Sequence, residues 1–276
     1  MKRNKTRDTG SSSIVNGQQD TIKKNSLYKV LSNIILISIT YFFLKINALA
    51  EEEVSYSKED SGKIIYTSGT GFYIDNTHII TNQHVVNSCR NIKVRGNASD
   101  SENAEIIGND YKNDLAIIKT SASRLQFASL RKDSMVDIGE EVTVIGYPRE
   151  YGISGKSLVK KAQVLNYGLD HGIKRIEFTD SVDKGNSGGP LLDKSGSVIG
   201  VISGRINYYL ADPDTGHIID KKPVKIESVA VGIDALKQLL EKYNIFYTEN
   251  ISNKSKKPQQ AEELANSFIV NIHCMK

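Results

Sequence analysis

Short runs of β-branched and aromatic residues alternate with turn residues through most of the chain between residues 60 and 245. Gly, Asn, Asp and Ser separate the runs. Runs of this composition and spacing predict the strands of an all-β sandwich or of β-barrels. The predicted strands are 63–66, 70–74, 78–81, 91–95, 115–119, 141–145, 158–165, 175–178, 189–192, 198–203 and 228–231.

One stretch near the end of this region has helical periodicity instead. Leu236, Leu239, Leu240 and Tyr243 recur at the spacing that places side chains on one face of a helix. Asp234 precedes them and is the residue type that caps a helix N-terminus. We therefore predict an all-β domain that ends in a packed C-terminal helix.

Residues 1–50 have the order of an export leader. The fifteen residues 30–44 are uncharged and mostly apolar, Lys23, Lys24 and Lys29 precede them, and the small-residue site Ala-Leu-Ala follows at 48–50. This order is typical of a signal peptide. About 20 apolar residues are needed to cross the hydrocarbon core, so fifteen are few for a permanent anchor. We expect a secreted or periplasmic protein, with a signal anchor as the alternative; contact with a membrane is expected only if the leader is uncleaved.

The charge of the chain is concentrated in that leader. Of 36 basic and 32 acidic residues, the first 50 positions hold eight and two, which leaves 28 and 30 for the rest. A remainder with this balance has no basic surface of the kind that nucleic acids need, so no nucleic-acid partner is expected. At 39% apolar and 25% charged residues, the whole chain has the composition of an ordinary globular protein.

Two cysteines, Cys89 and Cys274, are too few for a disulfide scaffold or a four-cysteine zinc site. We expect no metal and no cofactor. A bond between the two cysteines is possible on this count, and two free thiols are the favoured interpretation. Residues 251–262 are polar and contain a proline, so 251–276 is expected to be a polar tail.

The segment Gly-Asn-Ser-Gly-Gly-Pro at 185–190 is the sharpest chemical signal. Glycines on both sides of Ser187 let the backbone adopt positive φ and bring N–H groups together beside a hydroxyl. A serine nucleophile needs a base and a third group that orients the base. His84, at the end of an apolar run, and Asp114, at the head of another, are the candidates, with Asp110 as the fallback acid.

Five segments resemble the chymotrypsin-like (trypsin-like) serine proteases, in particular their HtrA/Deg-like branch. The three candidates also follow one another in that family's chain order, His, Asp, Ser. The resemblance covers about residues 60–245. It is carried by SGTGFYI at 68–74, ITNQHVV at 80–86, NDLAIIK at 113–119, EEVTVIGYP at 140–148 and GNSGGPLLDKSGSVIGV at 185–201.

The resemblance implies a serine endopeptidase that acts on protein or peptide substrates. Ser187 is then the nucleophile, His84 the general base, Asp114 the orienting acid, and the N–H groups of Gly185 and Ser187 form the oxyanion hole. The implied fold is a pair of six-stranded antiparallel β-barrels, about 60–150 and 156–245, within a protease domain at 51–250. The family's C-terminal PDZ module is not expected after that domain.

Two further expectations follow from the resemblance. The residues that would line the specificity pocket are Asp180, Ser181, Asp183, Ser203, Gly204 and Ala230. The polar stretch between Arg205 and Val224 is long for a strand connection, and we expect a surface loop beside the substrate cleft.

Asn186 bears on how the enzyme is activated. Secreted digestive relatives carry an aspartate there, which pairs with a newly cut N-terminus. An amide cannot make that charged pair, so activation without zymogen cleavage is expected.

Two other functions fit parts of the pattern. A binding or adhesion module can use the same fold without catalysis. A serine esterase carries G-x-S-x-G, as residues 185–189 do, but its serine lies between a strand and a helix and its histidine follows the serine. Here His84 precedes Ser187, which favours the protease.

Overall fold

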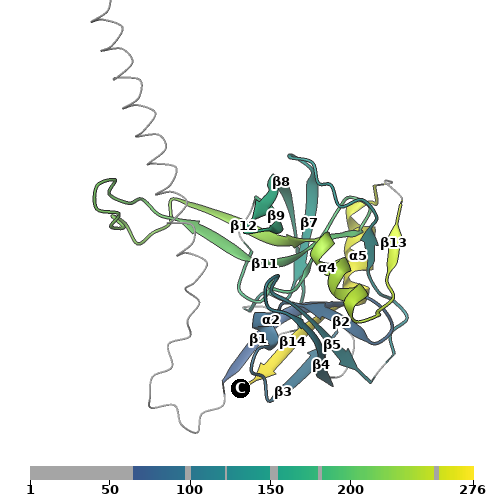
Figure 1. Cartoon of the computed structure of the whole chain (residues 1–276). Helices are drawn as coiled ribbons and strands as arrows, with labels where there is room; N and C mark the ends of the chain where they lie inside the picture. The colour runs from purple at the N-terminus through teal and green to yellow at the C-terminus, as the bar shows by residue number, and fades with distance from the viewer. Residues whose placement is uncertain (1–64, 97–100, 122, 150–154, 180–181, 252–254) are drawn as a thin grey trace, which may run out of the picture. The chain divides into compact units, whose positions relative to one another are not determined.

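The computed structural model describes residues 65–96, 101–121, 123–149, 155–179, 182–251 and 255–276 (Figure 1). The predicted leader lies outside these residues, as do Asp180 and Ser181 of the expected pocket. In these ranges, none of the helices has the length and apolar character that crossing a membrane requires.

Six strands close the first barrel, in the order β1-β14-β3-β4-β5-β2. The central apolar runs supply its core: all of β2 beyond His78 is buried, as are the first four residues of β5. Each neighbouring pair is antiparallel. The strands are β1 (Tyr66–Tyr73), β2 (His78–Thr81), β3 (Asn91–Arg95), β4 (Glu102–Asp110), β5 (Leu115–Thr120) and β14 (Ile269–Met275).

Six further strands form the second barrel, in the order β10-β7-β8-β9-β12-β11, and pairing of β10 with β11 closes it. A short strand, β6 (Ser129–Arg131), adds to β11, and β13 (Thr248–Asn250) adds to β6. The all-β fold of two six-stranded antiparallel barrels is therefore confirmed. The strands of this barrel are β7 (Glu141–Gly146), β8 (Leu158–Asp170), β9 (Ile173–Phe178), β10 (Pro190–Leu192), β11 (Val198–Tyr208) and β12 (Lys225–Gly232).

The predicted helix is α4 (Ile233–Lys242), and its apolar face packs into the core through Leu236, Leu239 and Leu240. The expected cap is wrong, because the helix begins directly after Gly232. Asp234 lies in the first turn instead and forms an ion pair with Lys174 at 2.5 Å. Burial by itself raises the pKa of Asp234, but the hydrogen bond and charge of Lys174 and a hydrogen bond from Ser134 outweigh it, so the pKa lies below its ordinary value.

The predicted polar tail is wrong for most of its length. After β13 the chain forms a helix, α5 (Pro258–Phe268), and then the strand β14. That strand pairs with β1 over seven residues and with β3 over five, so it is an integral part of the first barrel. The expectation of two free thiols fails for the same reason: β14 brings Cys274 to Cys89, with Cα atoms 5.4 Å apart, and the two form a disulfide.

The chain also changes barrels earlier than expected. The first barrel was expected to extend to about residue 150, with a linker near 151–156. In the structure β7 already pairs with β8 and β10 of the second barrel, so the change lies between β5 and β7. The expected loop at 205–224 is partly strand as well, because β11 continues to Tyr208 and β12 resumes at Lys225.

Candidate active site

His84 and Asp114 form a close pair at one end of the first barrel. A single helical turn, α2 (Gln83–Val86), follows β2 and carries His84. The imidazole Nδ1 lies 2.7 Å from Asp114 Oδ2, and the His84 backbone N–H donates to Oδ1 at 2.9 Å. The bond to Nδ1 orients the imidazole ring of His84, and the bond from the His84 backbone N–H holds the Asp114 carboxylate beside it. The imidazole remains partly accessible, with 41% of the side chain exposed.

The backbone of Asp114 is itself held in an uncommon conformation. Its φ of 54° lies in the left-handed region, at the end of the turn that joins β4 to β5. The carbonyl of Asp114 accepts hydrogen bonds from Asn82 Nδ2 at 2.8 Å and from the Gln83 N–H at 3.2 Å. Asp110, the alternative orienting acid, is bonded elsewhere: its carboxylate accepts hydrogen bonds from the backbone N–H and the side-chain amide of Asn113.

Ser187 lies on a tight loop just before β10 of the second barrel. Gly185 and Gly188 on either side have φ of 102° and 84°. A Cβ at Gly188 would lie 2.2 Å from Thr81 Oγ1, and one at Gly185 would lie 2.4 Å from the Tyr147 carbonyl. Positive φ and close approach therefore both require glycine, as the sequence predicted. Because a strand follows Ser187, the strand–serine–helix arrangement of an esterase is not present here.

Thr70 of β1 holds the Ser187 loop against the first barrel. Its Oγ1 donates to the Gly185 carbonyl at 2.7 Å and accepts from the Tyr147 N–H at 2.9 Å. Its own N–H donates to the Ser187 carbonyl at 2.8 Å. Thr70 is fully buried. Thr70 stands in the SGTGFYI segment that carries the family resemblance, but nothing in its neighbouring residues marks it as a functional position.

Ser203 connects Ser187 to the His84–Asp114 pair. Its Oγ donates to Asp114 Oδ2 at 3.3 Å, and its carbonyl accepts from Ser187 Oγ at 3.4 Å. Ser203 of β11 thus contacts both Asp114 and Ser187. The side chain of Ser203 is directed to Asp114, which differs from the specificity-pocket position expected for it.

The other expected pocket residues that the structure describes lie in three different environments. Gly204 borders open space, since a Cβ there would meet nothing within 4 Å. Ala230 is fully buried in the core of the second barrel. Asp183 forms an ion pair with Lys160 at 3.1 Å, so its charge has a partner within the protein.

Two backbone donors beside Ser187 are available to a ligand. The N–H groups of Gly185 and Ser187 donate to no residue that the structure describes. Both belong to the loop that Gly185 and Gly188 shape and that Thr70 fixes. Such a pair of donors next to a hydroxyl is the arrangement that stabilises an oxyanion.

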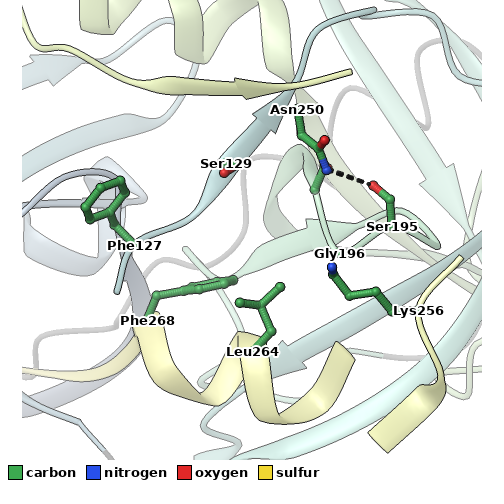
Figure 2. A pocket seen from close by; sticks show the side chains of 9 residues that line it. Phe127, Ser129, Ser195, Gly196, Asn250, Lys256, Leu264 and Phe268 are labelled. Atoms are coloured by element: carbon green, nitrogen blue, oxygen red, sulfur yellow. Dashed lines mark hydrogen bonds between the residues drawn. The ribbon is translucent and has the colours of Figure 1, made fainter. Parts of the chain in front are cut away.

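A separate pocket lies between α5, β13 and the turn after β10 (Figure 2). Asn250 donates to Ser195 Oγ at 3.5 Å and to Ser197 Oγ at 2.9 Å. The polar side chains of the pocket wall therefore hydrogen-bond mainly to one another. None of the candidate catalytic residues lines it. Its lining residues are Phe127, Ser129, Ser195, Gly196, Ser197, Asn250, Lys256, Leu264 and Phe268.

The two six-stranded barrels have the chymotrypsin-like fold, with His84 and Asp114 on the first barrel and Ser187 on the second. Comparison with known proteins agrees: residues 69–201 match the model of the trypsin-like peptidase domain. The family resemblance stated from the sequence is confirmed.

Among relatives, an uncharacterised protein of Sinorhizobium fredii is 31% identical over 75% of this chain and 32% of its own length. A protein of Hahella chejuensis, named as a DegP-like periplasmic serine endoprotease, is 33% identical over 50% of this chain and 29% of its own length. The chain thus spans about a third of the length of these relatives.

Solved structures show the same fold. A serine endoprotease from Yersinia pestis superposes with a TM-score of 0.50 at 25% identity, covering 64% of this chain and 57% of its own. The HtrA-type protease AlgW, solved with a decapeptide, gives a TM-score of 0.51 at 19% identity, covering 63% and 50%.

Proposed function

We propose that the chain is an exported serine endopeptidase that hydrolyses peptide bonds of protein or peptide substrates through an acyl-enzyme. The observation that carries the proposal is the His84–Asp114 pair, which is joined by two hydrogen bonds, together with Ser203, which contacts both Asp114 and Ser187. The trypsin-like peptidase domain matched by residues 69–201 contains all three residues.

The His84–Asp114 geometry supports a direction for the proton transfer. With Nδ1–H donated to the Asp114 carboxylate, the neutral imidazole carries its basic lone pair on Nε2. Ser187 Oγ attacks the substrate carbonyl carbon while its proton passes to His84 Nε2. The same nitrogen then protonates the leaving amine, and Asp114 stabilises the imidazolium between these steps.

The negative charge that develops on the carbonyl oxygen needs fixed donors. The N–H groups of Gly185 and Ser187 supply them, and one such donor stabilises a transition state by about 2.7–4 kcal/mol. Thr70 holds the loop that carries these donors by contacts that involve no new N-terminus. This fits the expectation that Asn186 needs no new N-terminus as a partner.

Export is supported by two independent features. Residues 23–50 have the order of a signal peptide. The Cys89–Cys274 disulfide is a bond that forms and persists in oxidising compartments outside the cytoplasm. The name of the Hahella chejuensis relative also describes a periplasmic protein.

Replacement of Ser187 or of His84 by alanine tests the catalytic assignment. Each variant is expected to lower kcat for casein or peptide cleavage by at least 10³-fold, with the double variant little worse, because triad members act as one unit. The matched control is Ser195→Ala, a buried serine of the separate pocket. It is expected to retain activity.

A fluorophosphonate probe distinguishes an enzyme from a binding module on the same fold. The native protein should be labelled on Ser187, and Ser187→Ala should not. Unchanged cleavage by Ser187→Ala, or native protein that the probe fails to label, would overturn the proposal.

A further inference from the structure

Asn82 is a buried amide between the end of β2 and the helical turn α2 that carries His84. The residue is fully buried. Its Nδ2 group donates to the Asp114 carbonyl at 2.8 Å. Its Oδ1 atom is also buried but has no hydrogen-bond partner in the part of the chain that the structure describes. The amide therefore acts through its donor half.

The unpartnered oxygen is informative about the role of Asn82. A buried polar atom without a partner destabilises the folded state, and an apolar side chain at the same place would remove that cost. A residue that only filled space here would therefore be apolar. The amide at this position points to a need for its N–H donor, and the group that receives it is the backbone of Asp114.

The backbone of Asp114 needs support because it is strained. Its φ of 54° lies in the left-handed region, which residues other than glycine adopt rarely. Strained backbone conformations persist where the surrounding structure fixes them. The Asp114 carbonyl accepts from Asn82 Nδ2 and, at 3.2 Å, from the Gln83 N–H. These two bonds hold the peptide group that follows Asp114.

The direction of the Asp114 carboxylate depends on this conformation. One carboxylate oxygen lies 2.7 Å from His84 Nδ1, and the other accepts from the His84 backbone N–H at 2.9 Å. Relaxation of Asp114 to an ordinary negative φ would turn the carboxylate relative to α2 and lengthen both contacts. The Asn82 amide thus acts on His84 through Asp114.

The Asn82 segment also lies against the loop that carries Ser187. A Cβ at Gly188 would lie 2.9 Å from the Asn82 nitrogen and 2.2 Å from Thr81 Oγ1. Thr81 Oγ1 donates to the Thr70 carbonyl at 2.8 Å, and the Thr70 N–H donates to the Ser187 carbonyl. The segment with the buried amide is therefore packed against the loop of the proposed nucleophile.

We propose that Asn82 is a positioning residue: its amide holds Asp114 in the left-handed conformation that directs the carboxylate to His84. This inference rests on the proposed protease function. Because Asn82 is fully buried, it touches neither substrate nor the reacting atoms. Its loss should therefore lower kcat and leave KM near the native value. A small misplacement of catalytic groups costs about 10²-fold in rate.

Asn82→Ala tests the proposal through kcat, KM and the pH profile of peptide cleavage. We expect kcat to fall about 10²-fold. The acidic limb of kcat/KM, which reports protonation of the base, should move to lower pH, because a carboxylate in contact with an imidazole stabilises its charged form. Arg175 of β9 also interacts electrostatically with Asp114, and it is the same in native protein and variant. A purely structural role would lower Tm without moving the pH profile.

Asn109→Ala is the matched control. Asn109 lies on β4 of the same barrel, and its Oδ1 is likewise buried without a partner among the described residues. Both substitutions remove a buried unpartnered acceptor, but only Asn82→Ala removes the bond to Asp114. Asn109→Ala should keep the native kcat and the native pH profile.

Gln83→Pro acts on the same Asp114 carbonyl from a second residue. It removes the other N–H donor at the first position of α2, where proline is well tolerated. Asn82, which precedes it, has φ −81° and ψ 151°, the extended conformation that is favoured before proline. This variant should also lower kcat and move the acidic limb to lower pH, and it decides the question if Asn82→Ala does not fold.

The outcomes separate the two proposals, with thermal unfolding as the check that each variant is folded. If native enzyme cleaves no peptide, the protease function fails. If native enzyme is active and folded Asn82→Ala keeps its kcat and pH profile, the protease stands and the positioning role is overturned. The role is also overturned if Asn109→Ala shows the same loss, or if Asn82→Ala does not fold and folded Gln83→Pro behaves as native enzyme.

Discussion

Thr70 shows how much a single buried hydroxyl contributes to the site. It bonds the Gly185 carbonyl, the Tyr147 N–H and, through its backbone, the Ser187 carbonyl. These bonds join β1 of the first barrel to the Ser187 loop of the second. A side chain of the same shape without the hydroxyl would leave two buried polar groups unpaired.

Thr70→Val is therefore expected to weaken both fold and activity. Each buried group left unpaired costs about 1–3 kcal/mol of the free energy of unfolding. Urea unfolding and kcat/KM should both show the loss, because the oxyanion donors lie on the same loop. Thr67→Val is the control: its hydroxyl is also buried on β1 but has no hydrogen-bond partner among the residues that the structure describes. Equal behaviour of the two variants would contradict the role of Thr70.

At the scale of elements, the strand β14 has the largest consequence. It separates β1 from β3 in the first barrel, so without it the closed sheet would expose two unpaired edges. The helix α5 carries the chain back to that position, and the disulfide joins β14 to the segment just after α2. The C-terminal segment thus supports the barrel on which His84 and Asp114 lie.

The double variant Cys89→Ser, Cys274→Ser is expected to lower the free energy of unfolding by about 2–4 kcal/mol, since the bond closes a long loop in the unfolded chain. Thermal unfolding without reductant measures the change. Addition of dithiothreitol should bring the native protein to the same Tm as the variant and leave the variant unmoved. A native Tm that matches the variant without reductant would contradict a stabilising bond.

At the scale of the whole molecule, the predicted leader and the disulfide both indicate export from the cytoplasm. An exported chain should begin at Glu51 and carry an oxidised Cys89–Cys274 pair. Mass spectrometry of protein recovered outside the cytoplasm, with and without thiol alkylation, checks both features. An intact leader on membrane-bound protein would favour the signal anchor, and alkylated thiols in native protein would contradict the oxidised pair.

Local patterns in the sequence determined most of the strands, the helix α4 and the candidate catalytic residues, whereas β4, β6, β13 and β14 were not predicted. Alternation of apolar residues and the glycines around Ser187 are local requirements, so they can be interpreted without knowing the rest of the fold. The structure bears out their local consequences: buried strands, positive φ at Gly185 and Gly188, and His84 bonded to Asp114.

Only the tertiary structure decided the role of residues whose partners are far away in the chain. Cys89 and Cys274 are 185 positions apart, and Thr70 lies 115 positions from Gly185. Nothing in the neighbouring residues encodes such pairs, because barrel closure depends on which strand edges meet. For the same reason the polar run at 251–262 gave no sign of α5 and β14, and the contact of the Ser203 hydroxyl with Asp114 could not be inferred from the sequence.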